Sequence, residues 1–236
     1  MIRRILLILL AGLVVTGSAI VVLRKTYHAG YAAGRQDLRV SLAPRGYNAR
    51  RSRILGFQAA NLPPGGAVVL GDSIVELQIF STLCGRPVLN AGMSGIKTGE
   101  LADQAPGILA QAHPSLVILA VGANDLTRST QTPTDQWRRD YARLLRAVGK
   151  TPLMIMGIQP FEQGKIYSGK IDPAGRRIEN VLLPQIASAA GAIYVPPLSS
   201  ADGLTSDGVH PNREGARHWQ ASVEAACPKL GQARGG

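Results

Sequence analysis

Five short apolar runs, each separated from the next by a longer amphipathic stretch, place the strongest constraint on how this chain folds. The runs are three to six residues long, a length that suits strands better than helices. Uninterrupted apolar strands that alternate with helices are typical of a parallel sheet covered on both faces. We therefore predict strands at Ala67–Leu70, Val88–Asn90, Leu116–Val121, Leu153–Met156 and Ala192–Val195, and helices at 74–82, 98–112, 134–149, 173–190 and 213–226.

This alternation predicts an α/β fold, a three-layer α/β/α sandwich around a flavodoxin-like, five-stranded parallel sheet. In the strand order 2-1-3-4-5, the first strand lies between the second and the third. The loops that leave the carboxyl ends of these strands then converge, and open α/β sheets bind their ligands at that edge.

Four polar motifs are expected at this edge. Gly71-Asp72-Ser73 follows the first strand, residues 90–95 (NAGMSG) follow the second, and residues 122–125 (GAND) follow the third. The fourth motif, residues 207–212 (DGVHPN), lies between the fifth strand and the last helix. The predicted topology brings all four together.

The residue types in these motifs are those of acyl transfer. Ser73 would lie at a strand-to-helix turn, and a serine becomes a good nucleophile only when a neighbouring base takes its proton. His210 is the candidate base, and Asp207 would accept a hydrogen bond from its other ring nitrogen. Gly208 permits a tight turn between them, and Pro211 disfavours a helix at His210.

The oxyanion of such a reaction needs hydrogen-bond donors that are already in place. We expect three of them: the backbone N–H of Ser73, the backbone N–H of Gly95 and the side-chain amide of Asn124. Gly95 has no Cβ, so its backbone can approach a substrate closely.

The four motifs, in this order, resemble the four sequence blocks of the SGNH (GDSL) hydrolases, and the resemblance covers roughly residues 65–226. It implies Ser73 as nucleophile, Gly95 and Asn124 as oxyanion donors, and Asp207 and His210 as the rest of a catalytic triad. It also implies an α/β/α sandwich with five parallel strands and a serine esterase that needs no cofactor. No residue pattern indicates a metal site.

The resemblance leaves the substrate open. The first hypothesis is removal of a small acyl group, an O-acetyl group of an envelope polysaccharide. Other hypotheses are a lysophospholipase or thioesterase acting on lipid esters, an acyltransferase, and a domain that binds glycans without catalysis. The polar stretch 158–175, with Phe161 and Tyr167, follows the fourth strand and is either a substrate-contacting loop or a mobile surface loop.

An uncharged, largely apolar run at residues 5–23 predicts a membrane segment, because nineteen helical residues at ~1.5 Å each nearly span a bilayer core. We expect an uncleaved signal anchor (1–25), a basic connector (26–62), a hydrolase domain (63–230) and a disordered tail (231–236). The domain is expected to be extracytoplasmic, periplasmic in a bacterium. Secretion after signal cleavage is the alternative.

Charge is concentrated beside this segment. Residues 1–60 hold ten Lys or Arg and one acidic residue, whereas residues 61–236 hold sixteen and fourteen. The predicted domain is therefore nearly neutral, which argues against nucleic-acid binding. Its two cysteines, Cys84 and Cys227, are either one disulfide or two buried thiols.

Overall fold

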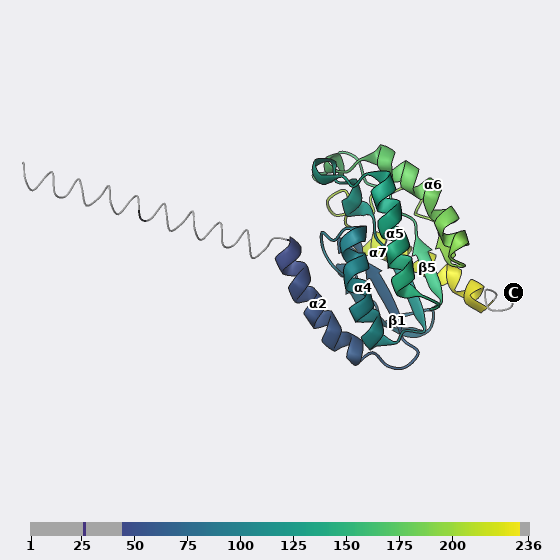
Figure 1. The fold of residues 1–236 in the computed structure, drawn as a ribbon. Helices are drawn as coiled ribbons and strands as arrows, with labels where there is room; N and C mark the ends of the chain where they lie inside the picture. The colour runs from purple at the N-terminus through teal and green to yellow at the C-terminus, as the bar shows by residue number, and fades with distance from the viewer. Residues whose placement is uncertain (1–25, 27–43, 232–236) are drawn as a thin grey trace, which may run out of the picture. The chain divides into compact units, whose positions relative to one another are not determined.

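The computed structural model describes residue 26 and residues 44–231 (Figure 1). The chain divides into two compact units, Met1–Tyr47 and Asn48–Gly236. The predicted membrane segment at 5–23 lies outside the described residues. Within the part that is described, no helix has the length and apolar character needed to cross a membrane.

A six-stranded sheet with the order β2-β3-β1-β4-β5-β6 forms the centre of the second unit. Its five parallel strands have the predicted order, and the predicted α/β sandwich is confirmed. The strands are β1 (Ala67–Gly71), β2 (Thr82–Leu83), β3 (Arg86–Gly92), β4 (Leu116–Ala120), β5 (Leu153–Met156) and β6 (Ile193–Val195).

The prediction of a five-stranded, purely parallel sheet was wrong at one edge. Strand β2 pairs with β3 in the antiparallel direction, so the sheet is mixed. The two residues that join these strands, Cys84 and Gly85, both have positive φ angles, 51° and 68°. Tight two-residue hairpins require such angles, and here they let the chain reverse directly into β3.

The helices are α2 (Pro44–Ala60), α3 (Ser73–Glu76), α4 (Thr98–Ala112), α5 (Thr134–Val148), α6 (Pro173–Ala189) and α7 (Arg213–Ala226). Short 3₁₀ helices lie at Ala123–Leu126, Arg128–Thr130, Ser168–Lys170 and Cys227–Gly231. The last four predicted helices are confirmed to within a residue at each end. The predicted helix at 74–82 was wrong, because α3 ends at Glu76 and the chain then continues to β2.

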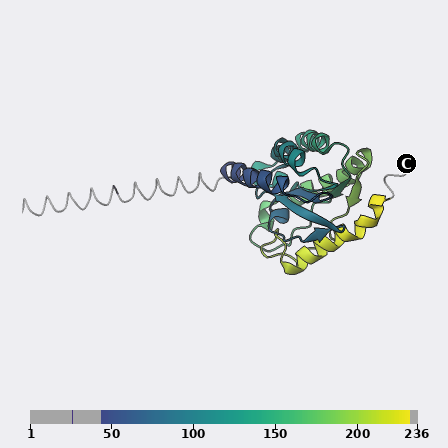
Figure 2. The ribbon, with the colours of Figure 1, turned by 90° about the horizontal axis from the view of Figure 1, so that it is seen from below.

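Helices cover both faces of the sheet, as Figure 2 shows. On one face, Val68 and Leu70 of β1 belong to a core cluster that also holds buried residues of α2, α4, α5 and α6. On the other face, Val69 belongs to a second cluster with Trp219 of α7. Alternate residues of a strand point to opposite faces, so both sets must be apolar, and this produces the uninterrupted apolar runs in the sequence.

Helix α2 lies within the stretch that was expected to be a connector. Its residues Leu55 and Ala59 are completely or almost completely buried and belong to the larger core cluster. From Asn48 onward, this helix is therefore part of the same compact unit as the sheet.

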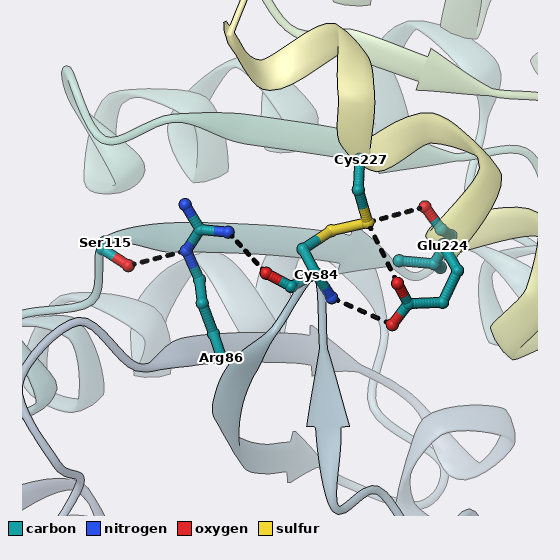
Figure 3. The surroundings of a disulfide bond; sticks show 6 residues. Cys84, Arg86, Ser115, Glu224 and Cys227 are labelled. Carbon is teal, nitrogen blue, oxygen red and sulfur yellow. Dashed lines mark hydrogen bonds between the residues drawn. A yellow bond between two sulfur atoms is a disulfide. The ribbon is translucent and has the colours of Figure 1, made fainter.

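A disulfide joins Cys84, at the β2–β3 turn, to Cys227, just after α7 (Figure 3). The two Cα atoms are 5.4 Å apart, although the residues are 143 positions apart in the sequence. The Cys84 N–H donates to the Glu224 carboxylate over 2.9 Å, and Arg86 donates to the Cys84 carbonyl. Of the two alternatives that the sequence left open, the structure contains the disulfide.

Candidate active site

The register of the sheet aligns the ends of three strands that carry polar motifs. Gly71 at the end of β1 pairs with Gly92 on β3 and with Ala120 on β4. The segments that follow, which contain Ser73, Gly95 and Asn124, therefore leave the sheet at the same edge.

Ser73 is the first residue of α3, and Asp72 is the N-cap of that helix. The Asp72 carboxylate accepts a hydrogen bond from the N–H of Ile74 over 2.9 Å, which fixes the turn on which Ser73 lies. Asp72 is only 1% exposed, and this burial raises the pKa of its carboxyl to about 6. Asp72 therefore acts as a structural support for Ser73.

His210 connects Ser73 to Asp207. Its Nε2 lies 2.9 Å from the Ser73 Oγ, and its Nδ1 lies 2.6 Å from the Asp207 Oδ2. The side chains of His210 and Asp207 are 27% and 23% exposed, so solvent and small molecules reach this group. The three residues come from opposite ends of the domain sequence.

The Asp207 carboxylate is held by its own turn. Its Oδ1 accepts the backbone N–H groups of Val209 and His210 over 3.0 and 2.9 Å. Burial acts to raise the pKa of Asp207, but these hydrogen bonds and the one from the His210 ring outweigh it and lower the pKa. Gly208 has a φ of 103°, which explains the glycine between the acid and the histidine.

The three expected oxyanion donors differ in their present partners. Within residues 44–231, no group accepts a hydrogen bond from the backbone N–H of Ser73 or of Gly95. The Asn124 amide donates to the carbonyl of Ile96 over 3.0 Å, which ties the third motif to the second. Asp125 strengthens the same link, because its carboxylate accepts both the N–H and the hydroxyl of Thr98.

The stretch 158–175 contacts the turn at residues 207–210, which carries Asp207 and His210. The N–H of Glu162 donates to the Gly208 carbonyl over 2.9 Å, and the N–H of Tyr167 donates to the Asp207 carbonyl over 3.0 Å. The Tyr167 ring is 41% exposed and lies edge-on to the His210 ring, with 6.2 Å between their centres. Phe161 is placed differently from our expectation, because it is only 8% exposed and packs in the core.

Comparison with known proteins identifies the family. The family model of the GDSL-like lipases and acylhydrolases matches residues 69–218, well over half of the chain. The chain belongs to the GDSL-like lipase/acylhydrolase family. Members of this family are carboxylic ester hydrolases, and that is the enzyme class of this chain.

Individual relatives are more distant. Thioesterase 1/protease 1/lysophospholipase L1 of Escherichia coli K12 is 26% identical over 175 residues, which cover 68% of this chain and 81% of that protein. A solved structure from Streptococcus pneumonia has a TM-score of 0.70 at 20% identity and covers 83% of this chain and 99% of its own. The acetyl xylan esterase AlAXEase has a TM-score of 0.59 at 17% identity, with coverages of 68% and 98%. At these identities, the two structures are similar in fold alone.

Sequence reasoning missed one carboxylate next to the candidate site of this acylhydrolase. Glu162 accepts hydrogen bonds from the N–H groups of Gly203 and Thr205, from the Thr205 hydroxyl and from Lys165. The hydrogen bonds from Thr205 and Lys165 lower its pKa to about 2. The Thr205 Oγ1 in turn accepts the Gly208 N–H over 3.1 Å. No local motif marks Glu162, because Gly203 and Thr205 lie 41 and 43 residues away in the sequence.

Among the described residues, one group of possible metal ligands comes together: Cys84, Glu224 and Cys227. The sulfurs of both cysteines form the disulfide, so they are not available as thiolate ligands.

Proposed function

We propose that this acylhydrolase is a serine esterase in which Ser73 is the nucleophile, His210 the general base and Asp207 the residue that orients the histidine. The observation that carries the proposal is the unbroken hydrogen-bonded sequence from Ser73 Oγ to His210 Nε2, and from His210 Nδ1 to the Asp207 carboxylate. Its order and its distances are those of a Ser-His-Asp triad.

The reaction follows from these contacts. The Ser73 Oγ attacks the carbonyl carbon of the ester while His210 Nε2 takes the hydroxyl proton. The C–O bond to the alcohol then breaks, and the imidazolium gives its proton to the leaving oxygen. A water activated by His210 attacks the acyl-serine, which releases the carboxylic acid and restores Ser73. Asp207 stays ionised throughout, in agreement with its lowered pKa.

The negative oxygen of the tetrahedral intermediate needs donors close to Ser73. The backbone N–H groups of Ser73 and Gly95 suit this role because no group among the described residues already accepts from them. The Asn124 amide has two hydrogens, of which one is donated to Ile96. The other can be donated to a substrate.

For the substrate, we propose a small acyl group, an O-acetyl group on an envelope polysaccharide. An acetyl xylan esterase is among the proteins with the same fold, which supports acetylated carbohydrate as a substrate class. Ser73 is partly exposed and the side chain of His210 is 27% exposed, so an acetyl group on a large polymer can reach the nucleophile.

A lysophospholipase or thioesterase activity is the second candidate. The Escherichia coli relative carries both descriptions. In this chain, Ile166 and Tyr167 are 74% and 41% exposed, and Tyr167 lies beside His210. These apolar side chains would suit the acyl chain of a lipid ester.

We further propose that residues 5–23 anchor the enzyme to a membrane, with the domain on the extracytoplasmic side. The Cys84–Cys227 disulfide supports this location, because disulfides persist in oxidising compartments and are rare in the cytosol.

The test is hydrolysis of p-nitrophenyl esters, from acetyl to long-chain, by the full chain and by Ser73→Ala. We expect turnover of the acetyl ester and a loss of about a thousandfold or more in the variant, the scale for a triad member. Ser188→Ala, which alters an exposed serine on α6, is the matched control and should retain full activity.

A preference for long-chain esters would indicate that the substrate is a lipid ester and not an acetylated glycan. Turnover that is equal in wild type and Ser73→Ala would overturn the triad. Acyl transfer to added sugar that exceeds hydrolysis would indicate an acyltransferase, and glycan binding without any turnover would indicate a binding domain.

A further inference from the structure

A carboxylate links the helix that carries Ser73 to the loop that carries Gly95, residues 93–97, called the Gly95 loop. Glu76 lies three residues after Ser73, at the end of α3. Its Oε2 accepts both the backbone N–H and the hydroxyl of Ser94, over 2.6 and 2.5 Å. Ser94 directly precedes Gly95. Glu76 therefore holds the segment that carries the backbone N–H of Gly95, one of the proposed oxyanion donors.

The other oxygen of this carboxylate faces an arginine from a different helix. The Nε of Arg51, on α2, lies 3.3 Å from the Glu76 Oε1. Arg51 also donates to the carbonyls of Gly92 over 3.1 Å and of Asn90 over 2.9 Å. Arg51 therefore contacts both the carboxylate and the end of strand β3, from which the Gly95 loop leaves. The two side chains are 17% and 11% exposed, so solvent screens this ion pair less than a surface pair.

The helix and the loop are packed without spare room. A Cβ added at Gly92 would lie 2.2 Å from the backbone nitrogen of Glu76. The Asn90 side chain donates to the carbonyls of Val75 and Gln78, over 2.8 Å each, at the end of the same helix. A change in the position of Glu76 would therefore move Ser73 and the Gly95 loop relative to each other.

We propose that Arg51 and Glu76 are positioning residues of the esterase, which hold the Gly95 N–H at the distance from Ser73 that the oxyanion requires. This inference rests on the proposed function. It also makes α2 a part of the working enzyme, although α2 precedes residues 69–218, where the family model matches. Donors aimed at developing charge are effective only if they are fixed before the reaction, and the ion pair supplies that fixation.

The experiment measures kcat and KM of the full chain on p-nitrophenyl acetate for Arg51→Met and Glu76→Gln. Met keeps the apolar stem of Arg51, and Gln keeps the shape of Glu76 while removing its charge. We expect kcat to fall about tenfold to hundredfold in each, less than the loss of a donor itself, with KM within about twofold. Arg53→Met, at an exposed position on the same helix, should leave both constants unchanged.

Two further measurements separate positioning from simple destabilisation. The affinity for a trifluoromethyl ketone, which forms a tetrahedral adduct with the serine, should weaken by the same factor as kcat/KM. The double variant should lose no more than the worse single variant, because the two residues act as one unit. Arg51→Lys should restore part of kcat, since a cation is again present.

Wild-type kcat in folded Arg51→Met and Glu76→Gln would overturn the inference. A loss that only follows the unfolded fraction in thermal melts, with unchanged affinity for the ketone, would overturn it as well. Either result, together with Ser73-dependent turnover in the wild type, would leave the proposed function intact. Turnover that is insensitive to Ser73→Ala would instead remove the proposed function itself.

Discussion

At the scale of single residues, the pKa values of acidic side chains around the candidate site are shifted in opposite directions. Asp207 accepts several hydrogen bonds that lower its pKa, whereas Asp72 and Glu179 are each only 1% exposed and have raised pKa values. For Glu179, burial is the largest cause, the nearby Asp125 and Asp172 add to it, and the pKa reaches about 9. At neutral pH, a carboxyl group is therefore an anion at Asp207 and a neutral acid at Glu179.

The raised pKa of Glu179 predicts a pH-dependent stability. Between pH 4.5 and about 9, folded Glu179 keeps its proton while the unfolded chain has lost it, so the free energy of unfolding falls as pH rises through this window. Gln has nearly the same shape and does not titrate. We therefore expect Glu179→Gln to melt several degrees above the wild type at pH 8 and no higher at pH 4.

Thermal melts at the two pH values check this prediction, with Asp202→Asn, at an exposed carboxylate, as the control. A Glu179→Gln variant that gains nothing at pH 8 would show that the folded protein tolerates the charged carboxylate at this position. The Oε2 of Glu179 is buried without a hydrogen-bond partner in the described structure, which argues that a charged carboxylate is unfavourable there.

At the scale of elements, the loop at residues 158–175 positions the turn that carries Asp207 and His210. Glu162 receives hydrogen bonds from Gly203 and Thr205, and Thr205 receives one from Gly208, which lies between Asp207 and His210. Glu162 therefore links the loop at residues 158–175 to the loop at residues 203–210, although the two are far apart in the sequence. The stretch 158–175 thus contacts the candidate site through its backbone and Glu162, whereas Phe161 packs in the core.

We expect Glu162→Ala to lower kcat/KM by about tenfold. The variant removes the hydrogen bonds that hold Thr205, and through it the turn that carries His210, while the triad residues themselves are unchanged. Steady-state kinetics on p-nitrophenyl acetate measure the effect. Gln163→Ala, at the exposed neighbouring residue, should retain wild-type values. Full activity in Glu162→Ala would mean that Tyr167 and Lys165 hold the turn without it.

At the scale of the whole domain, one covalent link closes a large part of the chain. The Cys84–Cys227 disulfide ties the antiparallel edge hairpin to the end of α7, and the segment that it closes contains strands β3 to β6. Crosslinks over long loops restrict the unfolded chain, and removal of a native disulfide typically costs about 2–4 kcal/mol.

The double variant Cys84→Ser/Cys227→Ser should therefore melt about 5–15 °C below the oxidised wild type. A reducing agent should lower the melting temperature of the wild type to a similar value and leave the variant unchanged. Esterase activity at room temperature should persist, because the disulfide lies on the face of α7 and β2 and contacts none of the proposed catalytic residues. An unchanged melting temperature on reduction would show that the link adds no stability.

The sequence by itself determined the layers and the order of the parallel strands, and it predicted the residues of the candidate site. Buried parallel strands must be apolar on both faces, so the runs at β1, β4 and β5 are visible without any knowledge of their neighbours. The groups proposed for catalysis follow these strands or precede α7 as short local motifs, and the strand order alone implies that they meet.

Only the tertiary structure decided the contacts between distant segments whose residues carry no local signal. The early end of α3 coincides with hydrogen bonds from Asn90, a residue of β3, and the edge strand β2 depends on a two-residue turn beside the disulfide. Likewise, Arg51 is one of several arginines on α2, and only its position across from Glu76 distinguishes it. Such roles arise from packing in three dimensions, because hydrogen bonds and ion pairs act over a few ångströms of space and take no account of sequence distance.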